Sequence, residues 1–340
     1  MPAAPPAILE ALRRRAGGAD AVGFADFVDV ALYEPGCGYY RRAARRIGRT
    51  PGTDFYTADS SPLFARLVVE ACAQLLGPEA PSAFDFVEVG AEPDGGVLRG
   101  VEHPFRSARA VCLGEPLRLD GPCVVFSNEL FDAQPFRRMR YRGGSWRELG
   151  VSFGDGALAE VELGLVRQPV PALPARAAEG YVIDAPLASA ELAGRIAELP
   201  WRGLFLAFDY GKPWEEIASA LPAGSARAYS RHTQANDLLA SPGEQDLTCH
   251  VCWDWISDAL KRHGFAEPVV ESQEAFLVRH CSGYMAQVAA RGAAQLDRDK
   301  LSLMQLLHPG NMGQKFQVLR ALRRSSPAGQ RKEAQVRKKN

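Results

Sequence analysis

The sequence lacks the features of membrane-spanning, secreted and nucleic-acid-binding proteins. Its 340 residues contain no run of 18 apolar residues, so we expect no membrane span. The N-terminus has no apolar core of a secretory signal peptide. Lysine plus arginine equals aspartate plus glutamate, at 40 each, and a net charge of zero argues against nucleic-acid binding. With 46% apolar residues, the chain has the composition of a globular protein with a sizeable core.

Cysteine is sparse and shows no metal-binding pattern. The seven cysteines are spread along the chain, which suits reduced thiols and predicts a cytoplasmic location. Arginines at positions 13–15 leave the mitochondrial matrix as the alternative. Cys249 and Cys252 form a lone C-x-x-C around His250, whereas a zinc site needs four ligands. We therefore expect no metal and interpret both cysteines as buried thiols.

Short, continuous apolar runs predict an α/β fold with a parallel sheet. Runs of this kind are typical of parallel strands that are covered on both faces. A further pair of alternating runs, at 146–151 and 158–163, predicts an antiparallel hairpin. Helical spacing of apolar residues predicts helices at 63–76, 186–198 and 253–264. The expected parallel strands are 84–89, 108–113, 123–127 and 204–209.

Composition divides the chain into three parts. Residues 1–80 are expected to form a helical and loop cap, with a helical entry at 7–33. Residues 81–322 contain the strands and form the main domain, with a long polar loop expected at 227–246. Residues 323–340 are polar and basic, which predicts a disordered tail.

Polar side chains follow the expected strand at 123–127 directly. Asn128, Glu129 and Asp132 place one amide and two carboxylates there. In open α/β sheets ligands bind at the carboxyl ends of the strands, so these residues form a candidate site. The same residues also favour a capped strand-to-helix turn, because Asn and Asp are common in such turns. The residues alone leave both interpretations open.

A glycine-containing turn follows the expected strand at 84–89. The strand ends in Glu88 and Gly90 and leads to Gly95 and Gly96. Glycines let the backbone approach a ligand closely, as nucleotide-type cofactors require. Two acidic residues within the turn would repel a pyrophosphate, but they would not repel the cationic groups of S-adenosyl-L-methionine.

Several longer motifs occur in order between about residues 8 and 320. They lie at 32–40, 54–57, 127–135, 209–211, 242–251, 272–277 and 312–316. These segments resemble the MidA-like class I S-adenosyl-L-methionine-dependent methyltransferases. That family includes the mitochondrial complex I assembly factor that dimethylates an arginine of a complex I subunit. The resemblance implies a Rossmann-like methyltransferase sheet with helices on both faces and family-specific helical and hairpin additions.

The resemblance also implies roles for particular residues. S-adenosyl-L-methionine is the expected cofactor, and Glu115 would hold its ribose hydroxyls. Glu129 and Asp132 would bind a guanidinium, whose planar fork matches carboxylates. The Asn128 carbonyl would accept a hydrogen bond from the target nitrogen, and His250 or His232 would accept the released proton. The expected cofactor-binding residues are Asp54, Thr57, Glu88, Gly90, Gly95, Glu115 and Asn128.

The chain departs from the family pattern at two places. Position 92 is Glu, where relatives usually have Gly. Cys123 begins the next strand only eight residues after Glu115, which is too short for the helix and strand that relatives have there. We therefore expect a shortened, divergent member, in which the strand at 108–113 lies at the sheet edge and part of the usual adenine wall is missing.

Two functions follow from these observations. The first is methyl transfer from S-adenosyl-L-methionine to a protein side chain, with arginine and a respiratory-complex subunit as the candidate acceptor and substrate protein. The second is a binding or assembly factor that keeps the methyltransferase fold without the cofactor. The polar residues at the strand ends favour the first function, because a scaffold need not keep buried polar groups that are costly for stability.

Overall fold

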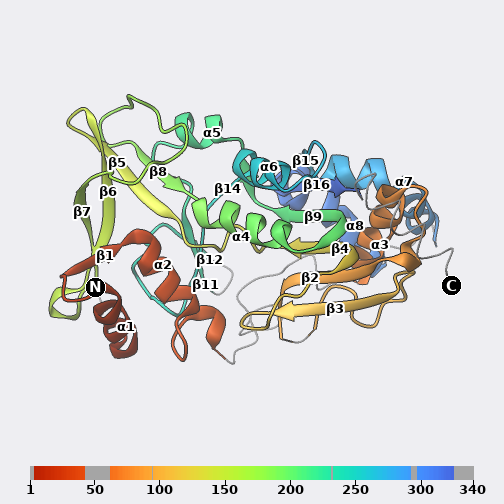
Figure 1. The fold of residues 1–340 in the computed structure, drawn as a ribbon, viewed down its shortest axis with the longest axis horizontal. Helices are drawn as coiled ribbons and strands as arrows, with labels where there is room; N and C mark the ends of the chain where they lie inside the picture. The colour runs from red at the N-terminus through yellow and green to blue at the C-terminus, as the bar shows by residue number, and fades with distance from the viewer. Residues whose placement is uncertain (1–3, 43–61, 94, 231–232, 292–296, 325–340) are drawn as a thin grey trace. The chain divides into compact units, whose positions relative to one another are not determined.

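The computed structural model describes residues 4–42, 62–93, 95–230, 233–291 and 297–324. The chain forms two compact units, and each is built from three separate segments (Figure 1). Unit 1 comprises the described residues of Met1–Ser60, Glu129–Leu192 and Asp209–Ile256, and unit 2 those of Ser61–Asn128, Ala193–Phe208 and Ser257–Asn340. The division of the chain at residues 80 and 322 stays a prediction, and the units follow other boundaries.

Unit 2 contains a six-stranded sheet in the order β15-β16-β9-β4-β2-β3. The strands β3, β2, β4 and β9 are parallel neighbours, whereas β15 and β16 are antiparallel. The four predicted parallel strands and the α/β Rossmann-like sheet are thus confirmed. The strands are β2 (Asp85–Ala91), β3 (Ser107–Cys112), β4 (Gly121–Asn128), β9 (Trp201–Asp209), β15 (Val269–Ser272) and β16 (Gln317–Arg323).

The parallel side of this sheet ends at β3. In the part of the chain that the structure describes, β3 pairs with β2 on one side and is the terminal strand on the other. The connection from β3 to β4 contains no helix or strand. The predicted edge position of this strand is therefore confirmed, because a connection of this length cannot form a crossover and a further parallel strand.

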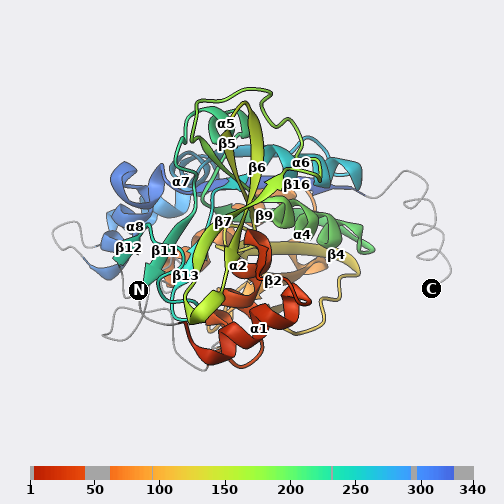
Figure 2. The ribbon, with the colours of Figure 1, turned by 90° about the vertical axis from the view of Figure 1, so that its left-hand side faces the viewer.

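Helices cover both faces of the six-stranded sheet. Figures 1 and 2 show α7 and α8 on one face and α4 on the other. On the first face, Phe64 and Phe276 pack against Phe208 of β9 with ring centroids 5.3 and 5.4 Å apart. Phe205, also in β9, packs against Phe265 instead, because successive side chains of a strand point to opposite faces. The helices are α3 (Pro62–Leu76), α4 (Leu187–Glu198), α6 (Trp253–Arg262), α7 (Gln273–Ala290) and α8 (Arg298–Leu307).

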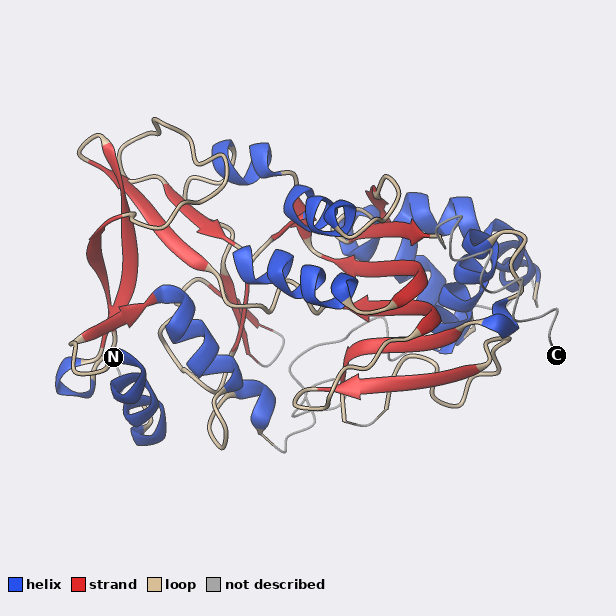
Figure 3. Ribbon diagram, in the orientation of Figure 1, coloured by secondary structure: helices blue, strands red, loops and turns tan. Residues whose placement is uncertain are grey.

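Unit 1 is built around an antiparallel sheet (Figure 3). Its strands run in the order β1-β6-β5-β8, and β7 also pairs with β6. The predicted hairpin is confirmed as β6 and β7, which are antiparallel. The elements of this part are α1 (Pro6–Ala16), β1 (Ala21–Gly23), α2 (Phe24–Tyr33), β5 (Arg137–Arg142), β6 (Ser145–Ser152), β7 (Ala159–Leu165) and β8 (Val182–Ala185).

Two expectations about the connecting and terminal segments are wrong, and a third is confirmed in more detail. The expected long loop at 227–246 contains β11 (Arg227–Ser230) and β12 (Thr233–Ala235), which form a three-stranded sheet with β13 (Asp246–Thr248). Strands of three or four residues are too short to show a clear alternation of apolar residues. The helical entry at 7–33 is confirmed and consists of the two helices α1 and α2, because Gly17 ends α1 in a left-handed conformation. The tail is expected to begin at residue 323, but Arg323 lies in β16 and donates hydrogen bonds to backbone carbonyls.

The remaining short elements complete the description. Unit 1 also contains β10 (Gly211–Lys212), which is parallel to β14 (Val251–Cys252), and α5 (Trp214–Ser219). Single helical turns occur at η1 (Tyr39–Arg41), η3 (Pro81–Ala83), η4 (Gly154–Gly156) and η5 (Pro309–Gly313). Among the described helices, none is both long and apolar enough to cross a membrane.

Candidate active site

Glu88 organises the turn that follows β2. Its side chain is buried, with 4% exposure, and Oε2 accepts a hydrogen bond from the Val97 amide at 2.5 Å. Burial raises the pKa of this carboxyl group to about 7, although the hydrogen bond from Val97 lowers it. A carboxylate at the strand end therefore holds the far side of the turn in place.

Glycines give this turn its shape. Gly90 (φ 84°) and Gly95 (φ 92°) adopt left-handed conformations that are costly for other residues. Gly90 also forms a bulge between Val89 and Ala91 of β2. A Cβ atom on Gly96 would lie 2.4 Å from Glu88 Oε2, so only glycine allows the backbone to pass this close. The adjacent pair of glycines signalled this position in the sequence, but Gly96 was not predicted as a site residue.

Glu115 and Asn128 follow strands of the same sheet. Glu115 lies in the turn after β3, where Oε2 accepts a hydrogen bond from the Cys112 amide at 2.8 Å. Asn128 is the buried last residue of β4 and lies opposite Phe208 of β9. Because β2, β3 and β4 are parallel neighbours, the structure brings Glu88, Glu115 and Asn128 to one edge of the sheet.

The electrostatics of this edge favour a cationic ligand without phosphate. The pKa of the Cys112 thiol is raised by burial and by the carboxylates of Glu115, Glu92 and Glu88. Negative charge at this position would repel a pyrophosphate. It would attract the sulfonium and ammonium groups of S-adenosyl-L-methionine. The residues present therefore fit this cofactor.

A second polar group lies in unit 1, in the segment 129–133, which we call the acceptor loop. Glu129 has a left-handed backbone (φ 51°), which costs about 1–2 kcal/mol for a residue other than glycine. The segment forms a turn and then continues into β5, so the alternative expectation of a strand-to-helix cap is wrong. Glu129 and Asp132 still lie close enough for the Glu129 charge to raise the Asp132 pKa.

Asp209, at the end of β9, accepts hydrogen bonds from amides of the acceptor loop. Its Oδ2 accepts hydrogen bonds from the amides of Phe131 at 2.8 Å and Asp132 at 3.3 Å. Its Oδ1 accepts one from the Tyr210 amide at 2.8 Å. These bonds favour the ionised form, but complete burial outweighs them and raises the Asp209 pKa to about 7.

The carbonyls of the acceptor loop are bound by four different groups. Gln134 Nε2 donates to Leu130 at 2.8 Å, and the Ser189 hydroxyl in α4 donates to Phe131 at 2.6 Å. The Cys249 amide donates to the Asp132 carbonyl at 2.9 Å, and the Tyr33 hydroxyl in α2 donates to Ala133 at 2.8 Å. Three of these donors are distant in sequence, so remote parts of the chain fix the carbonyls of the loop.

Several acidic and aromatic side chains surround Asp132. Its carboxyl group is buried, and burial together with Asp209, Glu129 and Asp246 raises its pKa well above the usual range. The Tyr40 hydroxyl donates a hydrogen bond to Asp246 Oδ1 at 3.0 Å. Tyr33 stacks on Tyr40 with ring centroids 5.5 Å apart. The two tyrosines were singled out in the sequence only as part of a loop motif, because their proximity to Asp132 depends on tertiary structure.

His250 has a different environment. Burial, followed by the charges of Lys212 and Arg227, lowers its pKa to about 4, so the imidazole is neutral at physiological pH. Among the described groups, none forms a hydrogen bond with its Nδ1 atom. The described His, Cys, Asp and Glu side chains include no group of three that could hold a metal ion. The predicted site residues Asp54, Thr57 and His232 lie outside the described residues.

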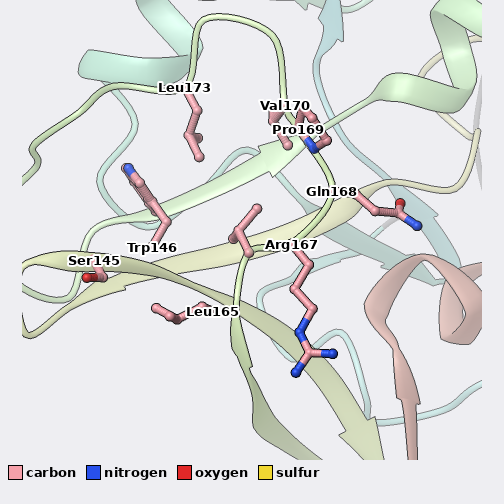
Figure 4. A pocket seen from close by; sticks show the side chains of 9 residues that line it. Ser145, Trp146, Leu165, Arg167, Gln168, Pro169, Val170 and Leu173 are labelled. Atoms are coloured by element: carbon pink, nitrogen blue, oxygen red, sulfur yellow. The ribbon is translucent and has the colours of Figure 1, made fainter.

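A shallow pocket of about 430 Å³ lies elsewhere in unit 1. Figure 4 shows the apolar side chains of Trp146, Leu165 and Leu173 around it. None of the described candidate site residues lines this pocket. The described candidate site residues thus lie at the strand ends and in the acceptor loop, and not around this pocket.

The comparisons with known proteins concern the family and the fold of the chain. Residues 111–269 match the family model described as "Putative S-adenosyl-L-methionine-dependent methyltransferase", a range that contains Glu115 and the acceptor loop. No curated protein matches the chain. Two solved structures from Burkholderia thailandensis are 25% identical, each over 95% of both chains. One is an inferred methyl transferase bound to S-adenosyl-homocysteine, with a TM-score of 0.79, and the other is an uncharacterized protein, with a TM-score of 0.73.

The predicted cofactor is the one that the matched family model names. The fold that the sequence predicts is also the fold of the two Burkholderia structures. In the sequence of its central segment and in its fold, the chain is thus similar to the S-adenosyl-L-methionine-dependent methyltransferases.

Proposed function

We propose that the protein transfers a methyl group from S-adenosyl-L-methionine to a cationic side chain of another protein, with arginine as the preferred acceptor. The observation that carries this proposal is the set of carboxyl groups around the acceptor loop. The charges that most raise the Asp132 pKa are those of Asp209, Glu129 and Asp246, all of them negative. A guanidinium that binds the Glu129 and Asp132 carboxylates within this group gains charge-assisted, bidentate hydrogen bonds.

The transfer itself is an in-line displacement in which the protein mainly positions the reactants. The cofactor supplies the methyl group: a carbon–nitrogen bond forms, the carbon–sulfur bond breaks, and its electron pair stays on sulfur. Glu129 and Asp132 hold the acceptor, and the Asn128 carbonyl orients the target nitrogen. His250, which is neutral, is the proposed acceptor of the proton that leaves this nitrogen.

We propose that five described residues bind the cofactor: Glu88, Gly90, Gly95, Glu115 and Asn128. Glu88 fixes the glycine turn through the Val97 amide. Glu115 accepts one backbone hydrogen bond, and a carboxylate can accept several, so it can also receive ribose hydroxyls. Asp54 and Thr57 keep the cofactor-binding role that the family resemblance implies. The same resemblance suggests a respiratory-complex subunit as the substrate protein.

A second candidate function is a binding or assembly factor that does not use the cofactor. Two observations favour it: position 92 carries Glu, and β3 is the terminal strand of the described sheet, so no neighbouring strand covers that side. Leu113, which follows β3, is 43% exposed. The two functions differ in whether the protein binds S-adenosyl-L-methionine and S-adenosyl-homocysteine.

The test combines calorimetry with a transfer assay. The wild type should bind S-adenosyl-homocysteine and should transfer labelled methyl groups from S-adenosyl-L-methionine to arginine residues of lysate proteins, detected after acid hydrolysis. Glu129→Gln should lower transfer by at least about 30-fold, because it leaves the substrate cation underpaired, which costs about 2–5 kcal/mol. Its cofactor affinity and melting temperature should stay close to those of the wild type.

Glu162→Gln is the matched control, because Glu162 lies in the same unit and pairs with Arg142 at the surface. It should transfer methyl groups as well as the wild type. An unfolded Glu129→Gln variant would show that the carboxylate is structural. Absence of S-adenosyl-homocysteine binding by the wild type would support the cofactor-free assembly factor.

A further inference from the structure

Asp209 ends β9, and the acceptor loop follows β4, its parallel neighbour in the sheet. Asn128 of β4 lies opposite Phe208 of β9 in the parallel register, and both strands end within one residue of this pair. Glu129 and Asp209 are the next residues along the two strands. The sheet register itself therefore places the Asp209 carboxyl group beside the first residues of the loop.

The amides of the loop donate hydrogen bonds to this carboxyl group, whereas the amides of a helix or strand donate to backbone carbonyls. The amides of Phe131 and Asp132 point to one oxygen of Asp209, and the residue is completely buried. Two amides that converge on one acceptor constrain the backbone on the C-terminal side of Glu129. The left-handed conformation of Glu129 is thus held by tertiary hydrogen bonds, since a side chain does not favour it locally.

We infer that Asp209 is a positioning residue of the methyl-acceptor site: through the amides of Phe131 and Asp132 it sets the direction in which Glu129 and Asp132 present their carboxyl groups. This inference rests on the proposed function, because it assigns Asp209 a role in binding the same cationic acceptor. Asp209 does not itself contact the acceptor. Its substitution should therefore change the use of the acceptor and leave the cofactor in place.

A purely structural role for Asp209 makes a different prediction. A buried carboxyl group that only stabilises the fold would lower stability when replaced and would affect all regions of the unit alike. Asp184 provides the matched control for this case. It is also completely buried, accepts a hydrogen bond from the Ala226 amide at 2.8 Å, and receives one from Arg138 at 2.7 Å.

The experiment compares the full chain with Asp209→Asn and Asp184→Asn. Three quantities are measured: hydrogen exchange of the Phe131 and Asp132 amides, affinity for S-adenosyl-homocysteine, and methyl transfer to a peptide of alternating glycine and arginine. Asp209→Asn should speed exchange of the two amides at least tenfold and raise the peptide KM at least tenfold. Its affinity for S-adenosyl-homocysteine should stay within threefold of the wild type. Asp184→Asn should change neither the exchange of these amides nor the peptide KM.

A second variant covers the case in which Asp209→Asn does not fold. Ser189→Ala removes the hydroxyl that donates to the Phe131 carbonyl and loosens the same loop through a different hydrogen bond. It should raise the peptide KM threefold to tenfold. An unchanged KM in Ser189→Ala would then overturn the inference.

The outcomes separate this inference from the function on which it rests. Unchanged amide exchange or an unchanged peptide KM in Asp209→Asn, with transfer by the wild type, overturns the positioning role alone. An equal effect of Asp184→Asn overturns it as well, in favour of a structural role. No transfer to the peptide by the wild type overturns the proposed arginine acceptor and this inference with it.

Discussion

The glycine turn after β2 and the acceptor loop after β4 use the same device in two ways. In each, a buried carboxyl group accepts hydrogen bonds from the backbone of the segment after a strand: Glu88 from Val97, and Asp209 from Phe131 and Asp132. In the glycine turn, the left-handed backbone conformations are adopted by glycines, Gly90 and Gly95. In the acceptor loop, a left-handed conformation is adopted by Glu129, which has a side chain.

This difference shows where each segment obtains its shape. Glycine reaches left-handed conformations at little cost, so the residues of the turn themselves encode its shape. Glu129 needs support from outside the loop, and the Tyr33 hydroxyl, the Ser189 hydroxyl and the Cys249 amide provide part of it. The turn should therefore respond to changes within it, and the acceptor loop to changes far away in the sequence.

The largest expected effect concerns the pH dependence of the two buried carboxyl groups. Burial raises the folded-state pKa of Glu88 from 4.5 to about 7 and raises that of Asp132 well above its usual range. Between the unfolded and the folded pKa the folded state binds more protons, so its stability falls as pH rises through this window. Glu88→Gln should remove this loss and should be more stable than the wild type at pH 8, by on the order of 3 kcal/mol.

Urea unfolding at pH 4.5 and pH 8 measures this effect. At pH 4.5 Glu88→Gln should match the wild type, because the carbonyl oxygen of the new glutamine side chain can still accept the Val97 hydrogen bond. Asp132→Asn should shift stability in the same direction, which would make the two segments alike in this respect. A Glu88→Gln variant that is less stable than the wild type at pH 8 would show that Glu88 is ionised and paired.

The next effect concerns shape within the glycine turn. In Gly96→Val, the new Cβ atom would lie 2.4 Å from Glu88 Oε2, so the carboxylate or the turn must move. We expect the affinity for S-adenosyl-homocysteine to fall at least 30-fold, which corresponds to about 2 kcal/mol. Calorimetric titration of the folded variant measures it.

Gly194→Ala is the control for this substitution. Gly194 lies in α4, and a Cβ atom added to it would meet no neighbouring atom within 4 Å. Alanine should leave the affinity unchanged and should stabilise the helix by about 0.5–1 kcal/mol. If Gly96→Val binds S-adenosyl-homocysteine like the wild type, this turn does not contact the cofactor. Gly90→Val should weaken binding for the related reason that Gly90 has a left-handed backbone.

The smallest expected effect tests the distant support of the acceptor loop. Tyr33→Phe removes the hydroxyl that donates to the Ala133 carbonyl at 2.8 Å. The lost hydrogen bond should lower the free energy of unfolding by about 1 kcal/mol. Methyl transfer to the glycine–arginine peptide should fall threefold to tenfold.

Tyr284→Phe serves as the comparison, because the Tyr284 hydroxyl accepts an exposed hydrogen bond from Arg66. It should change the free energy of unfolding by less than about 0.5 kcal/mol. Transfer that is equal in Tyr33→Phe and in the wild type would mean that Tyr33 adds stability to the loop without shaping it for the acceptor.

The sequence predicted those parts of the fold that local patterns encode. Four continuous apolar runs predicted β2, β3, β4 and β9, and the short connection after Glu115 predicted that β3 ends the sheet. The strands at 227–230 and 246–248 escaped prediction, because segments of this length show no reliable period. Most of the candidate site was likewise named from strand ends, and these assignments remain predictions until the variants are measured.

By itself, the sequence determined that polar residues would follow the parallel strands, because patterns of neighbouring residues encode both strands and turns. It placed Glu88, Glu115 and Asn128 at one edge through the rule that parallel strands end together. Only the tertiary structure decided that Asp209 binds the amides after Glu129, and that Tyr33 and Tyr40 lie near Asp132. These contacts join segments up to about 200 residues apart, such as Tyr40 and Asp246, and no local pattern encodes a pairing at that distance.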